Sequence, residues 1–338
     1  MSKPFNGVQV APPAAPNIKR RYSVTTDVVG YRRCPRQYGS IHVHKFAPSK
    51  QTQLYFGTIV HQVLDRCHSH YHGIVDPNTK GQLPDHGSVV SDATVSDFFD
   101  DLRDARKKQT ALPPVPSDIV RYFIEVEDGL ISQGIRAITP DLRLKAIRIL
   151  QYFNALEGPV LYPLVKDTEH RLQADQGTHI LHGVVDLLVD SSASGNPGDC
   201  EIWDYKGTQR IGLSQSDLDT YMFQMRVYAR LYELKHNVLP KKVVLYFLSE
   251  LEGNTCPTIR PANATLELDA KNGLSAGEIA RAVSEFAATV YKIESDRAVD
   301  TWNPAAPGCI SEQDCALCDF KWDCLTPNGG KGVKMTYP

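Results

Sequence analysis

The chain has 338 residues, which is enough to bury the core of one large domain or of two smaller ones. Its apolar content of 42% and charged content of 22% are those of a soluble globular protein, and no run of about 18 apolar residues predicts a membrane-spanning helix. The net charge of −2 argues against indiscriminate coating of nucleic acid but is compatible with DNA binding, for which the local charge matters.

Residues 1–20 predict a disordered lead-in, because they are rich in proline and show little hydrophobic periodicity. They lack the continuous apolar core of a signal peptide, so a cytoplasmic location is the default expectation. Basic side chains crowd the stretch that follows, and on charge alone a solvated face and a DNA contact are equally good interpretations. These side chains are Lys19, Arg20, Arg21, Arg32, Arg33 and Arg36.

The hydrophobic pattern then changes along the chain from helical to strand-like. Residues 53–72 predict an amphipathic helix, 73–92 a loop, and 97–156 several further helices, so that about 73–165 form a helical insertion. Strands are predicted at 178–190, 201–206 and 243–248, with helices at 214–236 and 275–295. This order indicates an α/β core with one mixed sheet. No GxxxxGK[ST] motif is present, so the chain encodes no obvious ATP motor of its own.

A carboxylate and an ammonium group share one face at the end of the strand predicted for residues 201–206. Side chains alternate along a strand, so Asp204 and Lys206 project together while Tyr205 points the other way. The same alternation places Glu201 on the opposite face and excludes it as a ligand. The carboxylate can hold a hard cation while the lysine orients or deprotonates a water beside it.

Asp186 lies in the preceding strand, within the sequence Gly183-Val-Val-Asp186. A hairpin would place its carboxylate next to that of Asp204, which gives two acidic groups for Mg2+ or Mn2+. Burying an Asp in an apolar strand is costly unless a metal, a cation or hydrogen bonds compensate. Taken alone, an Asp at the solvated end of a strand is the better interpretation, so this pair is a weak signal.

Two predicted helices carry polar residues at i and i+4, and therefore on one face. His61 follows Gly57 in this way, and the missing side chain of Gly57 would let DNA or another backbone approach closely. Gln224 and Tyr228 repeat the spacing on the helix after the Asp204 strand, which suits contacts to a phosphate or a stacked base. The simpler interpretations are a structural histidine and, together with Tyr221, core aromatics of an amphipathic helix.

The eight cysteines are unevenly placed. Cys315-x2-Cys318-x5-Cys324 brings three thiols into one short segment, and a metal site usually needs four ligands. Cys309, just upstream, and Cys34, near the other end of the chain, compete for the fourth position. The residues leave zinc and an iron–sulfur cluster equally open, and the spacing does not match the common ferredoxin patterns of electron-transfer proteins.

In this order the motifs resemble those of RecB-type PD-(D/E)xK nucleases that carry an iron–sulfur cluster, such as the AddB nuclease domain and the CRISPR-associated iron–sulfur exonucleases. The resemblance runs from about residue 22 to 325. The matching positions are, in succession, Cys34; Gly57 and His61; Gly183 and Asp186; Asp204 and Lys206; Gln224 and Tyr228; and Cys315, Cys318 and Cys324. It implies a restriction-endonuclease-like α/β core with a mixed central sheet, in a single nuclease domain over residues 21–325. Residues 303–325 would be the cluster-binding segment that closes onto Cys34, followed by a tail at 326–338.

The resemblance also assigns roles to single residues. It implies that His61, Asp186, Asp204 and the backbone carbonyl of Tyr205 bind Mg2+ or Mn2+, that Lys206 activates or positions the hydrolytic water, and that Gln224 and Tyr228 contact DNA. It implies a [4Fe–4S] cluster on Cys34, Cys315, Cys318 and Cys324, which would tie the two ends of the domain together. Cys309 is an extra cysteine that could replace Cys34 as a ligand, and Glu169 matches an acidic position in some relatives.

The implied activity is hydrolysis of DNA phosphodiester bonds. The family suggests an exonuclease acting on single-stranded ends, with endonuclease or flap cleavage as a further activity and the helical insertion as a gate or strand guide. A helicase or another partner would supply the single strands, in DNA repair, CRISPR spacer acquisition or anti-phage defence. The alternative function is a non-catalytic iron–sulfur subunit that binds DNA or acts as a scaffold, although the intact Asp186, Asp204 and Lys206 count against it. A nuclease with zinc in place of the cluster is a third expectation.

Overall fold

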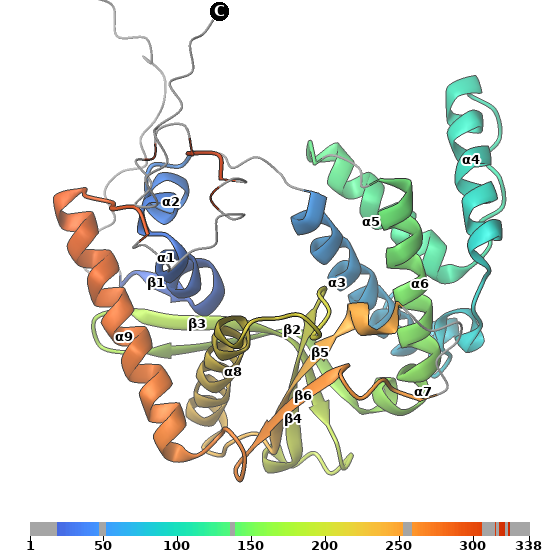
Figure 1. Ribbon diagram of the computed structural model, residues 1–338. Helices are drawn as coiled ribbons and strands as arrows, with labels where there is room; N and C mark the ends of the chain where they lie inside the picture. Colours follow the sequence, from blue (N-terminus) through green and yellow to red (C-terminus); the bar gives the residue numbers. More distant parts are fainter. Residues whose placement is uncertain are drawn as a thin grey trace, which may run out of the picture.

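A six-stranded mixed sheet lies at the centre of the chain and helices cover both of its faces (Figure 1). The computed structural model describes residues 19–46, 52–135, 139–252, 259–305, 315, 318–321 and 324. The strands run in the order β1-β3-β4-β5-β6, and β2 pairs with β3 off this path. Their bounds are β1 (Arg21–Ser23), β2 (Val165–Asp175), β3 (Ile180–Asp190), β4 (Cys200–Lys206), β5 (Lys242–Phe247) and β6 (Thr265–Asp269). The mixed α/β class predicted from the sequence is therefore confirmed.

The long strand β3 organises the sheet. It pairs with β2 in antiparallel fashion along almost its whole length. Residues 180–182 pair in parallel with β1, and residues 187–190 pair in antiparallel fashion with β4. Strand β4 then pairs in parallel with β5, which brings Asp204 and Lys206 level with Leu245 and Phe247. The segment of β3 between the β1-paired and β4-paired parts contains Gly183 and Asp186.

The loop of residues 191–199 joins β3 to β4 and is held by side-chain hydrogen bonds to its own backbone. The Asp190 carboxylate accepts hydrogen bonds from the backbone N–H groups of Ser194 at 3.2 Å and Gly195 at 2.7 Å. Asn196 then accepts a hydrogen bond from the N–H of Gly198 at 3.0 Å. Such side-chain acceptors satisfy the backbone donors of a turn, which is why Asp, Asn, Ser and Gly gather here. The strand that carries Asp204 is therefore placed beside the strand that carries Asp186.

The helices of the described residues form two groups (Figure 1). Helices α3 to α7 lie on one side, and α1, α2, α8 and α9 lie on the other. The helices are α1 (Gly30–Arg33), α2 (Pro35–Tyr38), α3 (Thr52–Tyr71), α4 (Asp92–Lys108), α5 (Asp118–Ser132), α6 (Pro140–Leu156), α7 (Gly158–Leu161), α8 (Gln215–His236) and α9 (Ala276–Val299). Short helical turns are η1 (Val24–Val29), η2 (Gly39–Val43), η3 (Pro77–Thr79), η4 (Pro84–Gly87), η5 (Tyr162–Leu164), η6 (Pro197–Asp199) and η7 (Leu248–Leu251).

Each face of the sheet has its own apolar core. On one face Trp203, Tyr205 and Tyr246 pack with the helices of the insertion, whereas on the other Ile202 and Leu245 pack with α8 and α9. This alternation is what a strand buried on both faces requires. Because even-numbered residues of β4 face α8, the side chains of Asp204 and Lys206 lie on the α8 side.

The structure also contains elements that the sequence pattern did not predict. Strands β1 and β2 fall in segments without a clear apolar alternation, and β2 is polar and mostly exposed, whereas β6 alternates over its five residues but was not predicted. The helices predicted at residues 53–72, 214–236 and 275–295 correspond to α3, α8 and α9, and α9 continues to Val299. The lead-in at residues 1–18 and the tail at 326–338 lie outside the described residues.

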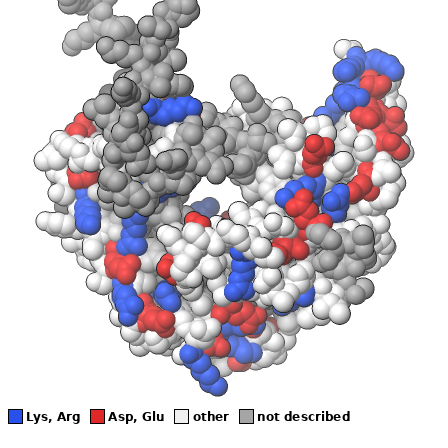
Figure 2. Space-filling view, viewed as in Figure 1, with Lys and Arg blue, Asp and Glu red and all other residues white. Residues whose placement is uncertain are grey.

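Charges of both signs are interspersed over the face seen in Figure 2, in keeping with the net charge of −2. Part of the basic N-terminal stretch is neutralised, since Lys19 pairs with Asp175 at 2.6 Å and Arg32 with Glu285 at 3.3 Å. In the part of the chain that the structure describes, no helix combines the length and the apolar character needed to cross a membrane.

Candidate active site

The end of β4 holds a buried ion pair. The ammonium Nζ of Lys206 lies 2.5 Å from Oδ2 of Asp204, and Asp204 is only 4% exposed. The two side chains lie on the α8 face, while Tyr205 between them is buried on the opposite face. Two charges removed from water in this way are stable only while both are present and further hydrogen bonds support them. The supporting groups come from α8.

Gln224 of α8 bridges the two charged residues. Its Oε1 accepts a hydrogen bond from Lys206 Nζ at 2.9 Å, and its Nε2 donates to Asp204 Oδ1 at 2.9 Å and to the Tyr228 hydroxyl at 3.0 Å. Gln224 and Tyr228 are both buried. Ser214 caps the N-terminus of helix α8, where a capping box with Asp217 satisfies the first backbone donors. The amide is therefore held from a fixed helix. The contact of Gln224 and Tyr228 with DNA stays a prediction.

Asp186 links β3, β4 and α3. Its Oδ2 accepts a hydrogen bond from the backbone N–H of Tyr205 at 2.6 Å, and its Oδ1 lies 3.4 Å from Nδ1 of His61. His61 comes from α3, which packs on the insertion side of the sheet. The ring of His61 also meets the Tyr205 ring edge-on, with centroids 6.1 Å apart. The structure thus brings together His61, Asp186, Asp204 and Lys206 from one helix and two neighbouring strands.

The regular alternation of β3 changes at Asp186. Leu181 and Val185 pack on the α8 side, but so does Leu188, whereas Leu187 packs on the insertion side. The paired strand β2 has Glu169 opposite Asp186, between the pairs Thr168↔Leu187 and His170↔Val185, and Glu169 has a left-handed φ of 48°. A non-glycine residue in this conformation is strained, and such strain often lies beside functional residues. At this irregularity the side chain of Asp186 contacts both His61 and the backbone N–H of Tyr205 in β4.

Glu169, noted from the resemblance, lies close to the same group. Burial raises its pKa above the usual value, the Asp186 carboxylate raises it further, and His61 lowers it. Its carboxyl group is therefore near enough to interact with both, although no hydrogen bond between them is present among the described residues.

The four clustered groups perturb one another's ionisation. Burial by itself lowers the pKa of His61, but the Asp186 carboxylate offsets this and the net shift is upward. Burial raises the pKa of Asp186, yet His61 and the Tyr205 N–H together bring it below the usual value. Burial holds the pKa of Asp204 above its usual value even though Lys206 opposes the shift. Burial lowers the pKa of Lys206, but Asp204 raises it more. Perturbed groups gathered in this way are typical of functional sites.

These residues fit a divalent cation by their chemistry. Carboxylate oxygens and one imidazole nitrogen are suitable donors for Mg2+ or Mn2+. Oδ2 of Asp204 is buried and, despite its close contact with Lys206 Nζ, receives no well-aligned hydrogen bond. However, no set of three or more His, Cys, Asp or Glu side chains within the described residues is arranged to hold a metal ion. The ammonium of Lys206 and the imidazole of His61 lie against the two carboxylates instead, so cation binding would require them to shift.

Tyr221 is a site residue that the sequence pattern did not single out. The Lys206 Nζ lies 4.7 Å from the centre of the Tyr221 ring, a distance typical of a cation–π contact. Tyr221 also packs against Phe247 of β5. Its i, i+3 spacing to Gln224 on α8 was the available signal, because it places the ring on the face that carries Gln224 and Tyr228.

The segment that carries Cys34 contacts Cys318 from the other end of the described chain, but no three cysteines among the described residues are arranged to hold a metal ion. Cys34 is buried at the junction of α1 and α2, and Gln37 Nε2 donates to the Sγ of Cys318 at 3.7 Å. Burial raises the pKa of Cys318 and of Cys324, and the nearby Cys34 thiol raises it in both. Cys315 acts in the same direction on Cys324. Cys309, which competes for the fourth position, lies outside the described residues.

Protein contacts alone also join these ends. Tyr31 of α1 donates to Asp296 of α9 at 2.6 Å, and Arg32 donates to Thr289 at 2.9 Å. The indole of Trp302 lies so close to Gly39 that a Cβ added there would come within 2.2 Å of the ring. Trp302 is also in edge contact with Tyr31.

Comparison with known proteins gives one clear result. The sequence profile described as the PD-(D/E)XK nuclease superfamily matches residues 23–325, which is most of the chain. A search of curated proteins finds no match.

Proposed function

The chain belongs to the PD-(D/E)XK nuclease superfamily, and from this we propose that it is a deoxyribonuclease that depends on Mg2+ or Mn2+. The observation that carries the proposal is the cluster of His61, Asp186, Asp204 and Lys206, in which Asp204 is buried and the other three side chains are partly buried. A protein that only binds DNA has no need for charged groups that are so expensive to bury.

His61, Asp186, Asp204 and the carbonyl of Tyr205 would hold the cation, which when bound supplies Lewis-acid polarisation of the scissile phosphate. The Tyr205 N–H orients Asp186 from behind through its 2.6 Å hydrogen bond. Lys206 donates its remaining N–H groups towards the phosphate or the attacking water. Gln224 and Tyr221 hold the Lys206 ammonium in place, through the 2.9 Å hydrogen bond and the ring contact at 4.7 Å. The side chains of the site would therefore contribute to catalysis by holding the Lys206 ammonium in a fixed position.

The test is digestion of plasmid DNA and of a single-stranded oligonucleotide by the native chain and by Lys206→Ala, with Mn2+ or Mg2+ and with chelator. We expect metal-dependent cleavage by the native chain and a loss of about 100-fold or more in Lys206→Ala. Lys271→Ala is the matched control, because it removes an exposed lysine from the turn before α9.

Removing Lys206 leaves the Asp204 carboxylate buried without its partner, which costs about 3–5 kcal/mol. Circular dichroism at the assay temperature therefore has to show that the variant is folded, and Asp186→Asn provides a second variant. Equal activity in the native chain and in both variants, or no activity in the native chain with either metal, would defeat the nuclease proposal.

We further propose that the chain is of the RecB type and that Cys34, Cys315, Cys318 and Cys324 hold a [4Fe–4S] cluster. The support is the order of the motifs and the contact of Gln37, three residues after Cys34, with the sulfur of Cys318 from the other end of the matched region. Anaerobically purified protein should be brown and contain about four iron atoms per chain. A colourless protein with stoichiometric zinc would replace the cluster by a zinc site and leave the nuclease proposal untouched.

The finer activity that we propose is exonuclease action on single-stranded ends, with a helicase or another partner supplying the strand. We also propose a single nuclease domain over residues 21–325, in which residues 73–165 are an insertion.

Digestion of an end-labelled oligonucleotide, compared with digestion of a circular single strand, distinguishes exonuclease from endonuclease action. Release of labelled mononucleotides or short products with an intact circle supports an exonuclease, and cleavage of the circle shows an endonuclease.

A further inference from the structure

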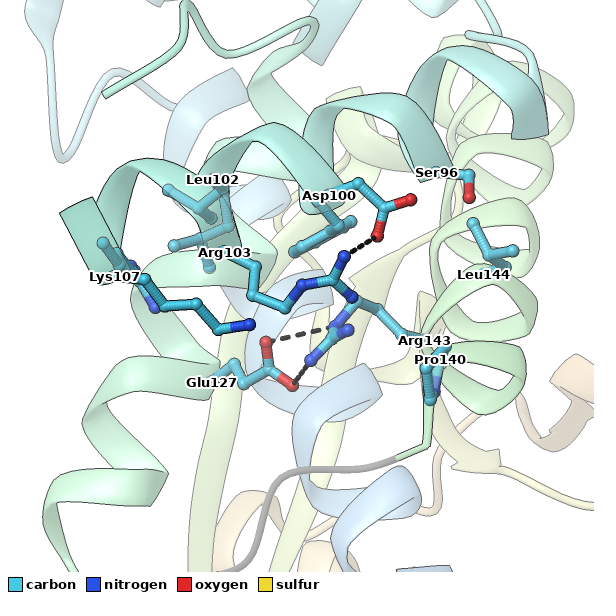
Figure 3. A pocket seen from close by; sticks show the side chains of 12 residues that line it. Ser96, Asp100, Leu102, Arg103, Lys107, Glu127, Pro140, Arg143 and Leu144 are labelled. Atoms are coloured by element: carbon cyan, nitrogen blue, oxygen red, sulfur yellow. Dashed lines mark hydrogen bonds and ion pairs between the residues drawn. The ribbon is translucent and has the colours of Figure 1, made fainter. Parts of the chain in front are cut away.

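A cavity of about 470 Å³ opens between α4, α5 and α6 in the helical insertion (Figure 3). Its size falls within the range of about 300–1,000 Å³ typical of small-molecule sites. Four cationic and two acidic side chains line it, together with apolar groups such as Phe99 and Leu144. A lining with apolar side chains and more cationic than acidic groups suits a ligand that carries a flat ring and an anionic group.

The fixed part of the cavity is the pair Arg143 and Glu127. Arg143 donates through Nη2 to Oε1 of Glu127 at 2.9 Å and through Nε to Oε2 at 3.3 Å, and both side chains are largely buried. The guanidinium carbon lies 4.5 Å above the centre of the Phe99 ring. The guanidinium is thus a planar group held by two hydrogen bonds and backed by an aromatic ring. Planes of this kind are surfaces on which a nucleobase stacks.

The adjustable part of the cavity is the last turns of α4. Arg103 pairs with Asp100 at 3.0 Å, but both side chains are mostly exposed, so the pair is weak and can be exchanged for another anion. Lys107 is exposed and has no hydrogen bond or ion pair with any other described residue. Figure 2 shows Lys and Arg atoms gathered at the tip of α4, where the last turn also contains Arg106 and Lys108. Lys107 is therefore a cation free to meet a phosphate.

We propose that this cavity binds a nucleotide unit, with its base against the Arg143 guanidinium and its phosphate beside Arg103 and Lys107. The unit is either a free mononucleotide or one residue of a single strand. This site is separate from the candidate active site, and it rests on the proposed function only in taking nucleotides as the ligands that the chain meets.

The test uses the full chain with no divalent cation added, so that nothing is digested. Two probes are titrated over a series of KCl concentrations: dTMP by calorimetry, and a fluorescein-labelled single-stranded oligonucleotide by anisotropy. Lys107→Glu should weaken binding about 10-fold and reduce the slope of log K against log salt by about 1, as for one lost phosphate contact. Lys108→Glu reverses a charge at the next position of α4 but outside the cavity lining, and should change the affinity less than about twofold.

A second variant tests the base. Arg143→Lys keeps the charge beside Glu127 but removes the planar group, so it should weaken dTMP or oligonucleotide binding about fivefold while leaving competition by inorganic phosphate unchanged. Dependence on Lys107 with dTMP shows that a free nucleotide suffices, and dependence with the oligonucleotide alone shows that the cavity takes a unit of a strand. Equal effects of Lys107→Glu and Lys108→Glu, or no effect of either, overturn the proposal.

The nuclease proposal is tested separately, by measuring the rate of DNA digestion with the same variants. With Mn2+ and saturating oligonucleotide, Lys107→Glu should digest at the native rate, because the cavity is not part of the cluster around Lys206. If Lys206→Ala digests as fast as the native chain, the proposed active site fails while the binding result for the cavity stands.

Discussion

The ring of Tyr228 lies directly against the backbone of Gly183, so that a Cβ at position 183 would come within 2.5 Å of Tyr228 Cε1. The contact joins β3 to α8 beside the candidate active site. Because Tyr228 in turn accepts a hydrogen bond from Gln224, the glycine decides where the amide that holds Lys206 and Asp204 can lie. The spacing between Gly183 and Asp186 on one strand and between Gln224 and Tyr228 on one helix thus belongs to a single packing arrangement.

Gly183→Ala should therefore impair the site through packing. The added methyl group displaces the Tyr228 ring, at a cost of about 1–3 kcal/mol in the free energy of unfolding. It also moves Gln224 away from Lys206, so we expect the rate of DNA cleavage to fall about 10-fold or more. Gly129→Ala is the matched control, since a Cβ there meets nothing within 4 Å and α5 favours alanine. Urea denaturation and initial rates check both effects, and a fully active Gly183→Ala would contradict this account.

Tyr221 should act on Lys206 through its ring and not through its hydroxyl group. Tyr221→Phe keeps the cation–π contact and should retain the native rate, whereas Tyr221→Leu removes it. A contact worth about 0.5–2 kcal/mol corresponds to a loss of roughly 2–30-fold, and it should appear in kcat with KM little changed. If Phe and Leu reduce the rate equally, the positioning role is wrong.

Gln224→Glu should be more harmful than Tyr228→Phe. The new carboxylate can still accept from Lys206, but it cannot donate to Asp204 and it adds a like charge beside it. We expect a destabilisation of about 1–3 kcal/mol together with most of the cleavage activity lost. Tyr228→Phe removes only the hydroxyl acceptor, and its thermal midpoint should lie nearer to that of the native chain. The reverse order in stability and activity would show that the amide does not bridge the ion pair.

His68, which lies behind the candidate site, should make the fold sensitive to acid. Burial lowers the pKa of His68 from 6.5 to about 3. Between these two values the unfolded chain binds the extra proton, so the free energy of unfolding falls as the pH falls through this window. His68 alone should lower the free energy of unfolding by about 2 kcal/mol between pH 7 and pH 5.

His68→Phe removes this contribution. The free energies of unfolding measured by urea titration at pH 7 and pH 5 should therefore differ by about 2 kcal/mol less in His68→Phe than in the native chain. His86→Asn serves as the control, because His86 is exposed and asparagine tolerates its left-handed backbone. An unchanged pH dependence in His68→Phe would show that this histidine is not the buried proton acceptor.

Strict periodicities were enough to predict part of the site. Two-residue alternation put Asp204 and Lys206 on one face of β4 and Tyr205 on the other, and four-residue spacing put Gln224 and Tyr228 on one face of α8. These rules fail where the backbone is irregular. At Asp186 the alternation of β3 changes beside the left-handed Glu169 of the paired strand, and no apolar pattern predicts such a change.

Contacts between elements that are distant in the sequence also could not be predicted from the sequence pattern. The ring of Tyr221 looks like any aromatic of an amphipathic helix until β4 brings Lys206 over it. Strand β2 was missed because its side chains are mostly polar and exposed, so that its backbone pairing with β3, and not burial, makes it a strand. The conformation of such elements is decided by their partners in the sheet.

The packing of Trp302 on Gly39 has a consequence for the order of assembly. Aromatic and polar contacts among the described residues already fasten the N-terminal segment to the last helix, so the two ends of the described chain are joined without any inorganic group. The cluster that we propose would then strengthen this joint and not create it, so that apoprotein should persist as a folded species.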